Sequence, residues 1–258
     1  MKESTSQHWE RYWRQEAQVE EIYSNEDRLL KHLLDLPLKN KWVLEVGAGS
    51  GRDSLILARN GARVVLLDYV ASSFQVIRRL AEEDGAEVIC VCADATRSPF
   101  RDNTFDLVFH QGLLEHFREP RDLLRDNFRI TAKNGYCLAD VPQKYHLYTF
   151  GKHILIALGR WFAGWETEFT PAELEHLMRE HGFQVVRTYG AWFVPGLFYR
   201  GIRFMLRRSG LARLPLYPPE IWPLSAMGRR WRRILSKYRW GLYTTAMIGV
   251  LGRKIHTT

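Results

Sequence analysis

Short apolar runs alternate with amphipathic segments over the first half of the chain. Five such runs predict strands, at residues 41–47, 63–68, 86–92, 105–110 and 136–141. Between them, apolar side chains recur at helical spacing, which predicts helices over 52–60, 71–83 and 123–130. Strands that alternate with helices in this way pair in parallel through right-handed crossovers. The pattern therefore predicts an α/β fold whose sheet is covered by helices on both faces.

The second half of the chain predicts two more strands and two long insertions. A helix over 170–181 leads into a sixth strand at 184–189, and a seventh strand is expected at 242–252. Residues 143–169 are rich in aromatic side chains, which predicts a lid. Residues 191–240 are predicted to form short helices and turns, because five prolines interrupt the segment, Pro195, Pro215, Pro218, Pro219 and Pro223.

Candidate chemistry stands where the first three predicted strands end. The first strand runs into a turn with glycines at positions 47, 49 and 51. Glycine permits positive φ and the close approach of a ligand, and free amides at the following helix start favour negative groups. Asp68 ends the second strand, about 20 residues after the first glycine, where a carboxylate can accept both hydroxyls of a ribose. Asp94 follows the third strand and can accept a hydrogen bond from an exocyclic amine. Because ligands of open α/β sheets bind beyond the carboxyl ends of the strands, these three ends predict an adenosine-containing ligand.

These residues, together with the run FDLVFHQGLLEHF at 105–117, resemble the class I S-adenosylmethionine-dependent methyltransferases. The run is similar to the subgroup of ubiquinone-type and other small-molecule methyltransferases, and the similarity covers residues 41–186. The resemblance implies a Rossmann-like fold with a mostly parallel seven-stranded sheet, an antiparallel last strand and lid insertions. It implies a single domain, 1–258, made of N-terminal helices that cover the cofactor (1–35), a cofactor-binding core (41–142), the aromatic lid (143–169) and a basic insertion between the last two strands (191–240).

The resemblance also implies the cofactor and the residues that bind it. S-adenosylmethionine is the implied cofactor, with Glu45 toward its methionine end, Asp68 on the ribose, and Asp94 with Ala95 on the adenine. The complete predicted set is Trp13, Glu45, Gly47, Gly49, Gly51, Asp68, Tyr69, Asp94, Ala95, His110 and Gln111. No metal is required for in-line methyl transfer.

Candidate catalytic and substrate residues follow from the chemistry of methyl transfer and from the aromatic lid. His116 is the first candidate for a general base, and His110 and His146 are the others, if the acceptor is a hydroxyl that must lose its proton. Substrate contacts are expected from the lid residues Tyr145, His146, Trp165 and Glu166. For Glu166, a local salt bridge is an equal alternative.

A nicotinamide dinucleotide enzyme is the main competing hypothesis, since it also combines a glycine turn with an acid on the second strand. Its third glycine would fall at position 52, which is Arg52. Glu45 and Asp94 also favour the methyl donor over a dinucleotide.

Charge is distributed unevenly along the 258 residues, whose formal net charge is +8. From residue 196 to the end there are 13 Lys and Arg but one acid, Glu220. In the 196–240 segment these cations alternate with aromatic residues. Such a segment can lie on an anionic membrane surface, bind single-stranded nucleic acid, or pack on the core with a solvated cationic rim.

Composition narrows the class of protein. Three cysteines cannot form a fully paired disulfide framework. The polar N-terminal residues do not resemble a signal peptide. No apolar run approaches the roughly 20 residues of a membrane span. The sequence thus predicts a cytoplasmic methyltransferase, compatible with peripheral membrane association, that acts on oxygen of a small-molecule or lipid-like acceptor. An RNA methyltransferase and a non-catalytic binding protein with the same fold remain alternatives.

Overall fold

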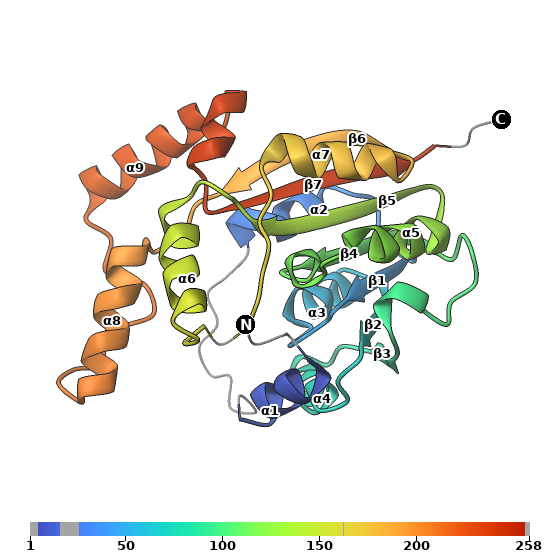
Figure 1. Ribbon diagram of the computed structural model, residues 1–258, viewed down its shortest axis with the longest axis horizontal. Helices are drawn as coiled ribbons and strands as arrows, with labels where there is room; N and C mark the ends of the chain where they lie inside the picture. Colours follow the sequence, from blue (N-terminus) through green and yellow to red (C-terminus); the bar gives the residue numbers. More distant parts are fainter. Residues whose placement is uncertain (1–4, 16–25, 162, 256–258) are drawn as a thin grey trace.

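The computed structural model describes residues 5–15, 26–161 and 163–255, drawn in Figure 1. Its centre is one seven-stranded sheet in the order β3-β2-β1-β4-β5-β7-β6. The strands are β1 (Trp42–Val46), β2 (Arg63–Asp68), β3 (Val88–Cys92), β4 (Phe105–Gln111), β5 (Thr131–Pro142), β6 (Phe183–Ala191) and β7 (Met247–Lys254). Strands β1 to β5 pair in parallel, and β7 is antiparallel to both β5 and β6. The predicted fold class, including the antiparallel last strand, is confirmed.

Helices cover both faces of the sheet because each strand of its central part is apolar on both sides. One face packs on α5 (Pro120–Ile130) and α7 (Pro171–Glu180), with Leu44, Val108 and Ala139 in that core. The opposite face packs on α3 (Arg52–Arg59), α4 (Ser73–Asp84), the π-helical turn η1 (Glu26–Leu30) and α2 (Lys31–Leu34), with Val43 and Leu66 in that core. Continuous apolar runs are the expected sequence of strands buried in this way.

The last strand begins later than predicted. Residues Arg239–Thr244 form a 3-10 helix, η4, and β7 starts only at Met247. The hydroxyl of Thr244 donates to the carbonyl of Gly241 at 2.7 Å, and that of Thr245 to the carbonyl of Leu242 at 2.6 Å. These local hydrogen bonds close a turn in a stretch whose apolar pattern alone favours a strand.

The basic insertion forms two long helices rather than several short ones. They are α8 (Leu197–Ser209) and α9 (Trp222–Leu235), of 13 and 14 residues. The prolines do not interrupt them, because Pro195 precedes α8, the next three lie between the helices, and Pro223 occupies the first turn of α9. Proline is tolerated in a first turn, where its missing N–H has no helical partner.

The other elements lie around the carboxyl ends of the strands. They are α1 (Ser6–Gln15), the short 3-10 helices η2 (Ala95–Arg97) and η3 (Leu114–His116), and α6 (Leu147–Ala157) in the predicted lid segment. In Figure 1, α6, α8 and α9 stand together at the left, beyond the end of the sheet. Within the described ranges, no helix combines the length and apolar character needed to cross a bilayer.

Candidate functional site

The glycine turn after β1 is held in place by β2. Gly47, Gly49 and Gly51 have φ values of 66°, 54° and 65°, a region that other residues rarely adopt. Asp68 accepts a hydrogen bond from the backbone N–H of Gly49 at 3.2 Å and another from that of Val70 at 3.0 Å. The carboxylate that the sequence predicts for a ribose therefore also shapes the loop, and an ionised carboxylate has further lone pairs for hydroxyl donors.

A cavity of about 480 Å³ opens beyond the ends of β1, β2, β3 and β4. Nine of the eleven predicted cofactor residues line it, namely Trp13, Glu45, Gly47, Gly49, Asp68, Tyr69, Asp94, Ala95 and Gln111. Trp13 comes from α1, and a Cβ at Gly49 would lie 2.9 Å from its ring. The wall is thus tight at the glycine turn, so only a residue without a side chain fits there.

Gly51 and His110, which were also predicted to face the cofactor, do not line the cavity. Gly51 packs inward, where a Cβ would lie 3.1 Å from Leu66 and 3.2 Å from Ile77, and it lets α3 approach the sheet. His110 is fully buried on the opposite face of β4 from Gln111. Successive side chains of a strand point to opposite faces, and Gln111 is the one that reaches the cavity.

Glu45 is a buried carboxyl group on the cavity wall. It is 6% exposed, and among the described residues its Oε2 has no hydrogen-bond partner. Burial, reinforced by the nearby charge of Asp53, raises the pKa of Glu45 to about 8. A buried carboxyl group with an unused oxygen is suited to bind a cationic or hydrogen-bond-donating group of a ligand.

Asp94 both caps a turn and borders the cavity. Its Oδ1 accepts hydrogen bonds of 2.8 Å from the backbone N–H and the hydroxyl of Thr96, at the start of η2. Asp94 is therefore a turn cap as well as a residue of the cavity wall. The cap leaves Oδ2 for another donor.

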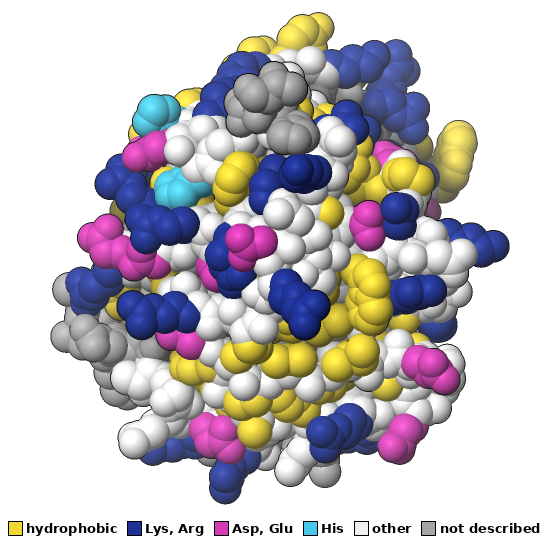
Figure 2. All heavy atoms as spheres, turned by 90° about the vertical axis from the view of Figure 1, so that its right-hand side faces the viewer, with side chains coloured by type: hydrophobic (Ala, Val, Ile, Leu, Met, Phe, Trp, Pro, Cys, Tyr) yellow, Lys and Arg dark blue, Asp and Glu magenta, His cyan; other side chains and the backbone are white. Residues whose placement is uncertain are grey.

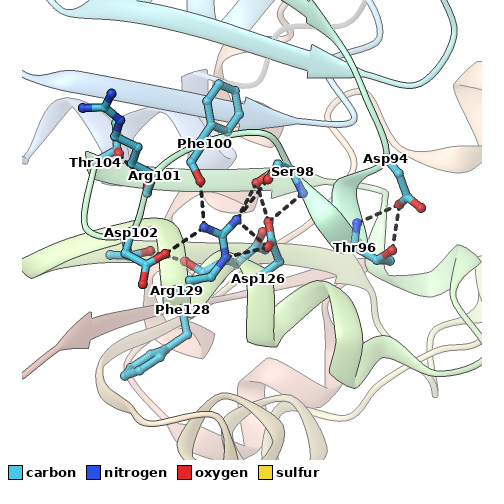
Figure 3. A network of polar contacts seen from close by, with 12 residues as sticks. Asp94, Thr96, Ser98, Phe100, Arg101, Asp102, Thr104, Asp126, Phe128 and Arg129 are labelled. Carbon is cyan, nitrogen blue, oxygen red and sulfur yellow. Dashed lines mark hydrogen bonds and ion pairs between the residues drawn. The ribbon is translucent and has the colours of Figure 1, made fainter.

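A polar network centred on Arg129 supports the segment that follows Asp94 (Figure 3). Arg129 donates to Asp126 at 2.7 and 2.9 Å, to Asp102 at 2.9 Å and to the carbonyl of Phe100 at 2.7 Å. Ser98 binds the second oxygen of Asp126. The network ties the loop after η2 to α5, and sequence analysis missed it because its partners lie about 30 residues apart.

His116, the first candidate base, lies on the cavity wall in η3. Its ring meets that of Trp9 edge to face at 5.3 Å, and its Nδ1 has no hydrogen-bond partner among the described residues. Burial lowers the pKa of His116 below its ordinary value. The imidazole is therefore neutral at pH 7 and able to accept a proton.

The predicted substrate residues have other partners in the structure. The ring of Tyr145 stacks on that of Tyr243, and Nδ1 of His146 accepts from the backbone of Tyr148 at the start of α6. Arg118 covers the ring of Trp165 at 4.7 Å. None of the predicted substrate residues lines the cavity.

Glu166 makes the salt bridge that was the alternative to substrate contact. Its carboxylate binds Lys152 at 2.6 Å and accepts from the indole N–H of Trp161 at 2.7 Å. Lys152 is 1% exposed and also binds Glu168 at 2.7 Å. A buried ammonium group requires such partners, so the Glu166 carboxylate is engaged by Lys152 and Trp161.

A second buried cluster, not anticipated from the sequence, lies at the end of β5. Asp140 accepts from Arg28 and, at 2.7 Å, from the hydroxyl of Tyr189. Asp140 pairs in register with Gln111, so the cluster is a strand neighbour of the cavity wall. The contact between Arg28 and Asp140 spans 112 residues, and no local pattern could have indicated it.

Comparison with known proteins agrees with this geometry. Residues 44–139 match a family described as a methyltransferase domain. A ubiquinone biosynthesis O-methyltransferase of Ruegeria sp. (strain TM1040) is 29% identical over 67% of this chain and 71% of the relative. A demethylmenaquinone methyltransferase of Clavibacter sepedonicus is 38% identical over 38% of this chain and 40% of the relative.

A solved structure shares the fold. The magnesium protoporphyrin IX methyltransferase from Synechocystis PCC 6803, with bound SAH, has 15% sequence identity and a TM-score of 0.57 over 88% of this chain and 80% of that one. The family match, the curated relatives and this fold agree with one another. The chain therefore belongs to the class I S-adenosylmethionine-dependent methyltransferases of the small-molecule type, and S-adenosylmethionine is its cofactor.

Proposed function

We propose that this enzyme methylates an oxygen atom of a small-molecule or lipid-like acceptor, with His116 as the general base. One observation carries the proposal: Glu45, Asp68 and His116 line the same cavity. An acceptor in this cavity could therefore contact both the bound methyl donor and the proposed base.

On the donor side, each proposed contact has a group suited to it. Oε2 of Glu45 receives the ammonium group of the methionine part, the remaining lone pairs of Asp68 receive the ribose hydroxyls, and Asp94 receives the adenine amine with help from the backbone of Ala95. Trp13 closes the cavity over the glycine turn. When bound, S-adenosylmethionine supplies a methyl group on a positively charged sulfur atom.

On the acceptor side, His116 has the protonation state that a base needs. Its lowered pKa keeps the ring neutral, and its unpartnered Nδ1 can take the proton of an acceptor hydroxyl. General-base catalysis of this kind typically contributes about 10²- to 10⁴-fold. The aromatic wall formed by Trp9 and Phe117 favours an acceptor with an apolar body.

The names of two relatives support this acceptor class. They refer to ubiquinone biosynthesis and to demethylmenaquinone, and the first specifies O-methylation. By analogy, we propose an acceptor with a ring hydroxyl and an apolar substituent. We also propose that the enzyme acts in the cytoplasm. Its free cysteines Cys90, Cys92 and Cys137 are consistent with that reducing compartment.

The proposal is tested by following labelled methyl groups. The enzyme is incubated with methyl-labelled S-adenosylmethionine and either phenols of increasing alkyl length, fatty acids or total RNA. We expect label in an alkali-stable ether of a phenol. An alkali-labile ester would make the acceptor a carboxylate that needs no base, label in RNA would favour the nucleic-acid alternative, and absence of transfer to any of the three classes would favour the binding-protein alternative.

The role of His116 is tested by His116→Asn. We expect kcat to fall by about 10²-fold or more while the Kd of S-adenosylmethionine stays unchanged. His176→Asn, an exposed histidine on α7, serves as the control and should leave kcat unaltered. Unchanged kcat in His116→Asn would remove the base from the proposal.

A further inference from the structure

Helix α6 is inverted relative to an ordinary amphipathic surface helix. On its inner face the charged residue Lys152 is buried and forms ion pairs with Glu166 at 2.6 Å and Glu168 at 2.7 Å. Its outer face carries an apolar stripe at positions i, i+3, i+7 and i+11, formed by Leu147, Phe150, Ile154 and Leu158, which are 76%, 67%, 48% and 60% exposed. Helical periodicity normally directs such a stripe into the core, so this one is available to a partner.

The two helices of the basic insertion also expose apolar side chains. No residue of α8 is buried, and Phe198 and Met205, seven residues apart on one face, are 83% and 66% exposed. On α9, Met227, Trp231 and Ile234 share one face at positions i, i+4 and i+7 and are all exposed. The three outward apolar stripes together are called the α6–α8–α9 face below.

The parts of this face are adjacent in space. Figure 1 shows the three helices grouped on one side of the molecule. Phe193 connects two of them, because its ring packs edge to face on Tyr148 of α6 at 5.1 Å and lies under Arg200 of α8 at 4.7 Å. The hydroxyl of Tyr199 donates to the carbonyl of Pro215 at 2.8 Å and so ties α8 to the segment before α9.

The charge of the basic insertion is almost entirely positive. Residues 196–240 contain eleven Lys and Arg and one acid, Glu220. Exposed cations of this segment include Arg207, Arg208, Arg213, Arg230, Arg233 and Lys237. Figure 2 shows a different side of the molecule, where Lys and Arg are interspersed with Asp and Glu. An anionic partner is therefore expected on the α6–α8–α9 face in particular.

We infer that the α6–α8–α9 face binds the surface of an anionic lipid bilayer. Exposed Phe, Trp and Leu side chains next to Arg and Lys are what an interfacial helix needs, since its apolar stripe enters the acyl boundary while its cations meet the headgroups. Nucleic acid would use the cations and aromatic rings but would leave the aliphatic stripe of α6 exposed. A second copy would bring eleven cations against eleven, which disfavours self-association.

The test is cosedimentation of the full chain with vesicles of phosphatidylcholine alone and with vesicles in which phosphatidylglycerol replaces part of it. We expect at least about tenfold stronger partitioning into the anionic vesicles, decreasing with added salt. The double variant Phe150→Ser/Ile154→Ser and the double variant Arg230→Glu/Arg233→Glu should each reduce that partitioning by about tenfold or more. Ile89→Ser on β3 and Arg101→Glu are the matched controls, because both residues are exposed and lie outside the face.

Folding and donor binding are checked in every variant by thermal melting and by the Kd of S-adenosylmethionine, which these surface changes should not alter. Equal partitioning into both vesicle types, or none into either, would overturn the inference. Full binding by Phe150→Ser/Ile154→Ser would overturn it as well. RNA retention without vesicle binding would assign the face to nucleic acid, and a dimer in light scattering that this variant dissociates would assign it to self-association.

Discussion

The affinity for S-adenosylmethionine should depend on the protonation state of Glu45. Burial raises the pKa of this carboxyl group to about 8 in the free protein, so most molecules carry it protonated at pH 7. A bound ammonium group next to Oε2 favours the ionised form and lowers the pKa. Binding below pH 8 therefore releases a proton, and affinity should rise with pH toward a plateau above about 8.

The size of the effect follows from the ionised fraction of Glu45. With the pKa at about 8, roughly 1% of the protein is ionised at about pH 6 and roughly a quarter at about pH 7.5. If only the ionised form binds tightly, the Kd falls roughly 25-fold over this range, or about 2 kcal/mol. The range stays below about 7.7 to 8.0, where an α-amino group loses its own proton.

Titration calorimetry at the two pH values measures both the Kd and the proton release. At the lower pH, the binding enthalpy should differ between buffers of different ionisation enthalpy, because nearly one proton leaves per ligand. Glu45→Gln has no carboxylate to ionise, so its Kd should be weak and independent of pH. Glu87→Gln, an exposed carboxyl group at the start of β3, should behave like the parent protein.

Two results would refute this reasoning. A Kd that is constant with pH in the parent protein would show that no buried carboxyl group is ionised on binding. A pH dependence that persists in Glu45→Gln would assign the proton to a different group, such as Asp68, whose pKa is also raised by burial.

Three further predictions concern the same region. Asp68→Ala should weaken donor binding by roughly 1 to 3 kcal/mol in calorimetry, since it removes an acceptor from buried hydrogen bonds; unchanged affinity would contradict the ribose assignment. Gly49→Ala should reduce the affinity for the donor and the melting temperature more than Gly85→Ala does. Both glycines have positive φ, but only at Gly49 would the new Cβ meet another side chain, that of Trp13 at 2.9 Å. Equal losses in the two variants would show that backbone strain alone matters. Burial raises the pKa of Glu115 to about 8, so this group should lower the free energy of unfolding by about 1 kcal/mol per pH unit as pH rises from about 5 to about 8, in addition to the contribution of Glu45. In denaturant titrations, Glu115→Gln should reduce the measured slope by about that amount.

The residues that line the cavity on the proposed donor side were predictable because their signals are local. The glycine turn, Asp68 and Asp94 each follow directly on an apolar run, and the parallel arrangement of those runs brings their ends to one edge of the sheet. His110, which was predicted with them, does not line the cavity. The apolar pattern indicates where β4 ends, but it does not indicate which of two adjacent side chains points to the face with the cavity. In the structure that residue is Gln111.

The two buried polar clusters near the cavity were not predictable to the same extent, because long-range contacts build them. Arg28 meets Asp140 across 112 residues, and Lys152 of α6 turns inward to meet Glu166 and Glu168. Aromatic composition indicated a lid over 143–169, but composition does not state which face of a helix is buried. The inverted α6 follows from the ion pairs, and these require the folded chain.

The inversion of α6 links the two proposals physically. The same polar cluster that turns the apolar stripe of α6 outward anchors the following loop to the cavity, because the backbone N–H of Thr167 donates to the carbonyl of Glu115 at 2.9 Å, next to His116. A bilayer bound at the α6–α8–α9 face would thus be connected to the base through one short, hydrogen-bonded segment. Because an apolar acceptor partitions from water into a bilayer, membrane binding would place the enzyme where a lipid-like acceptor is concentrated.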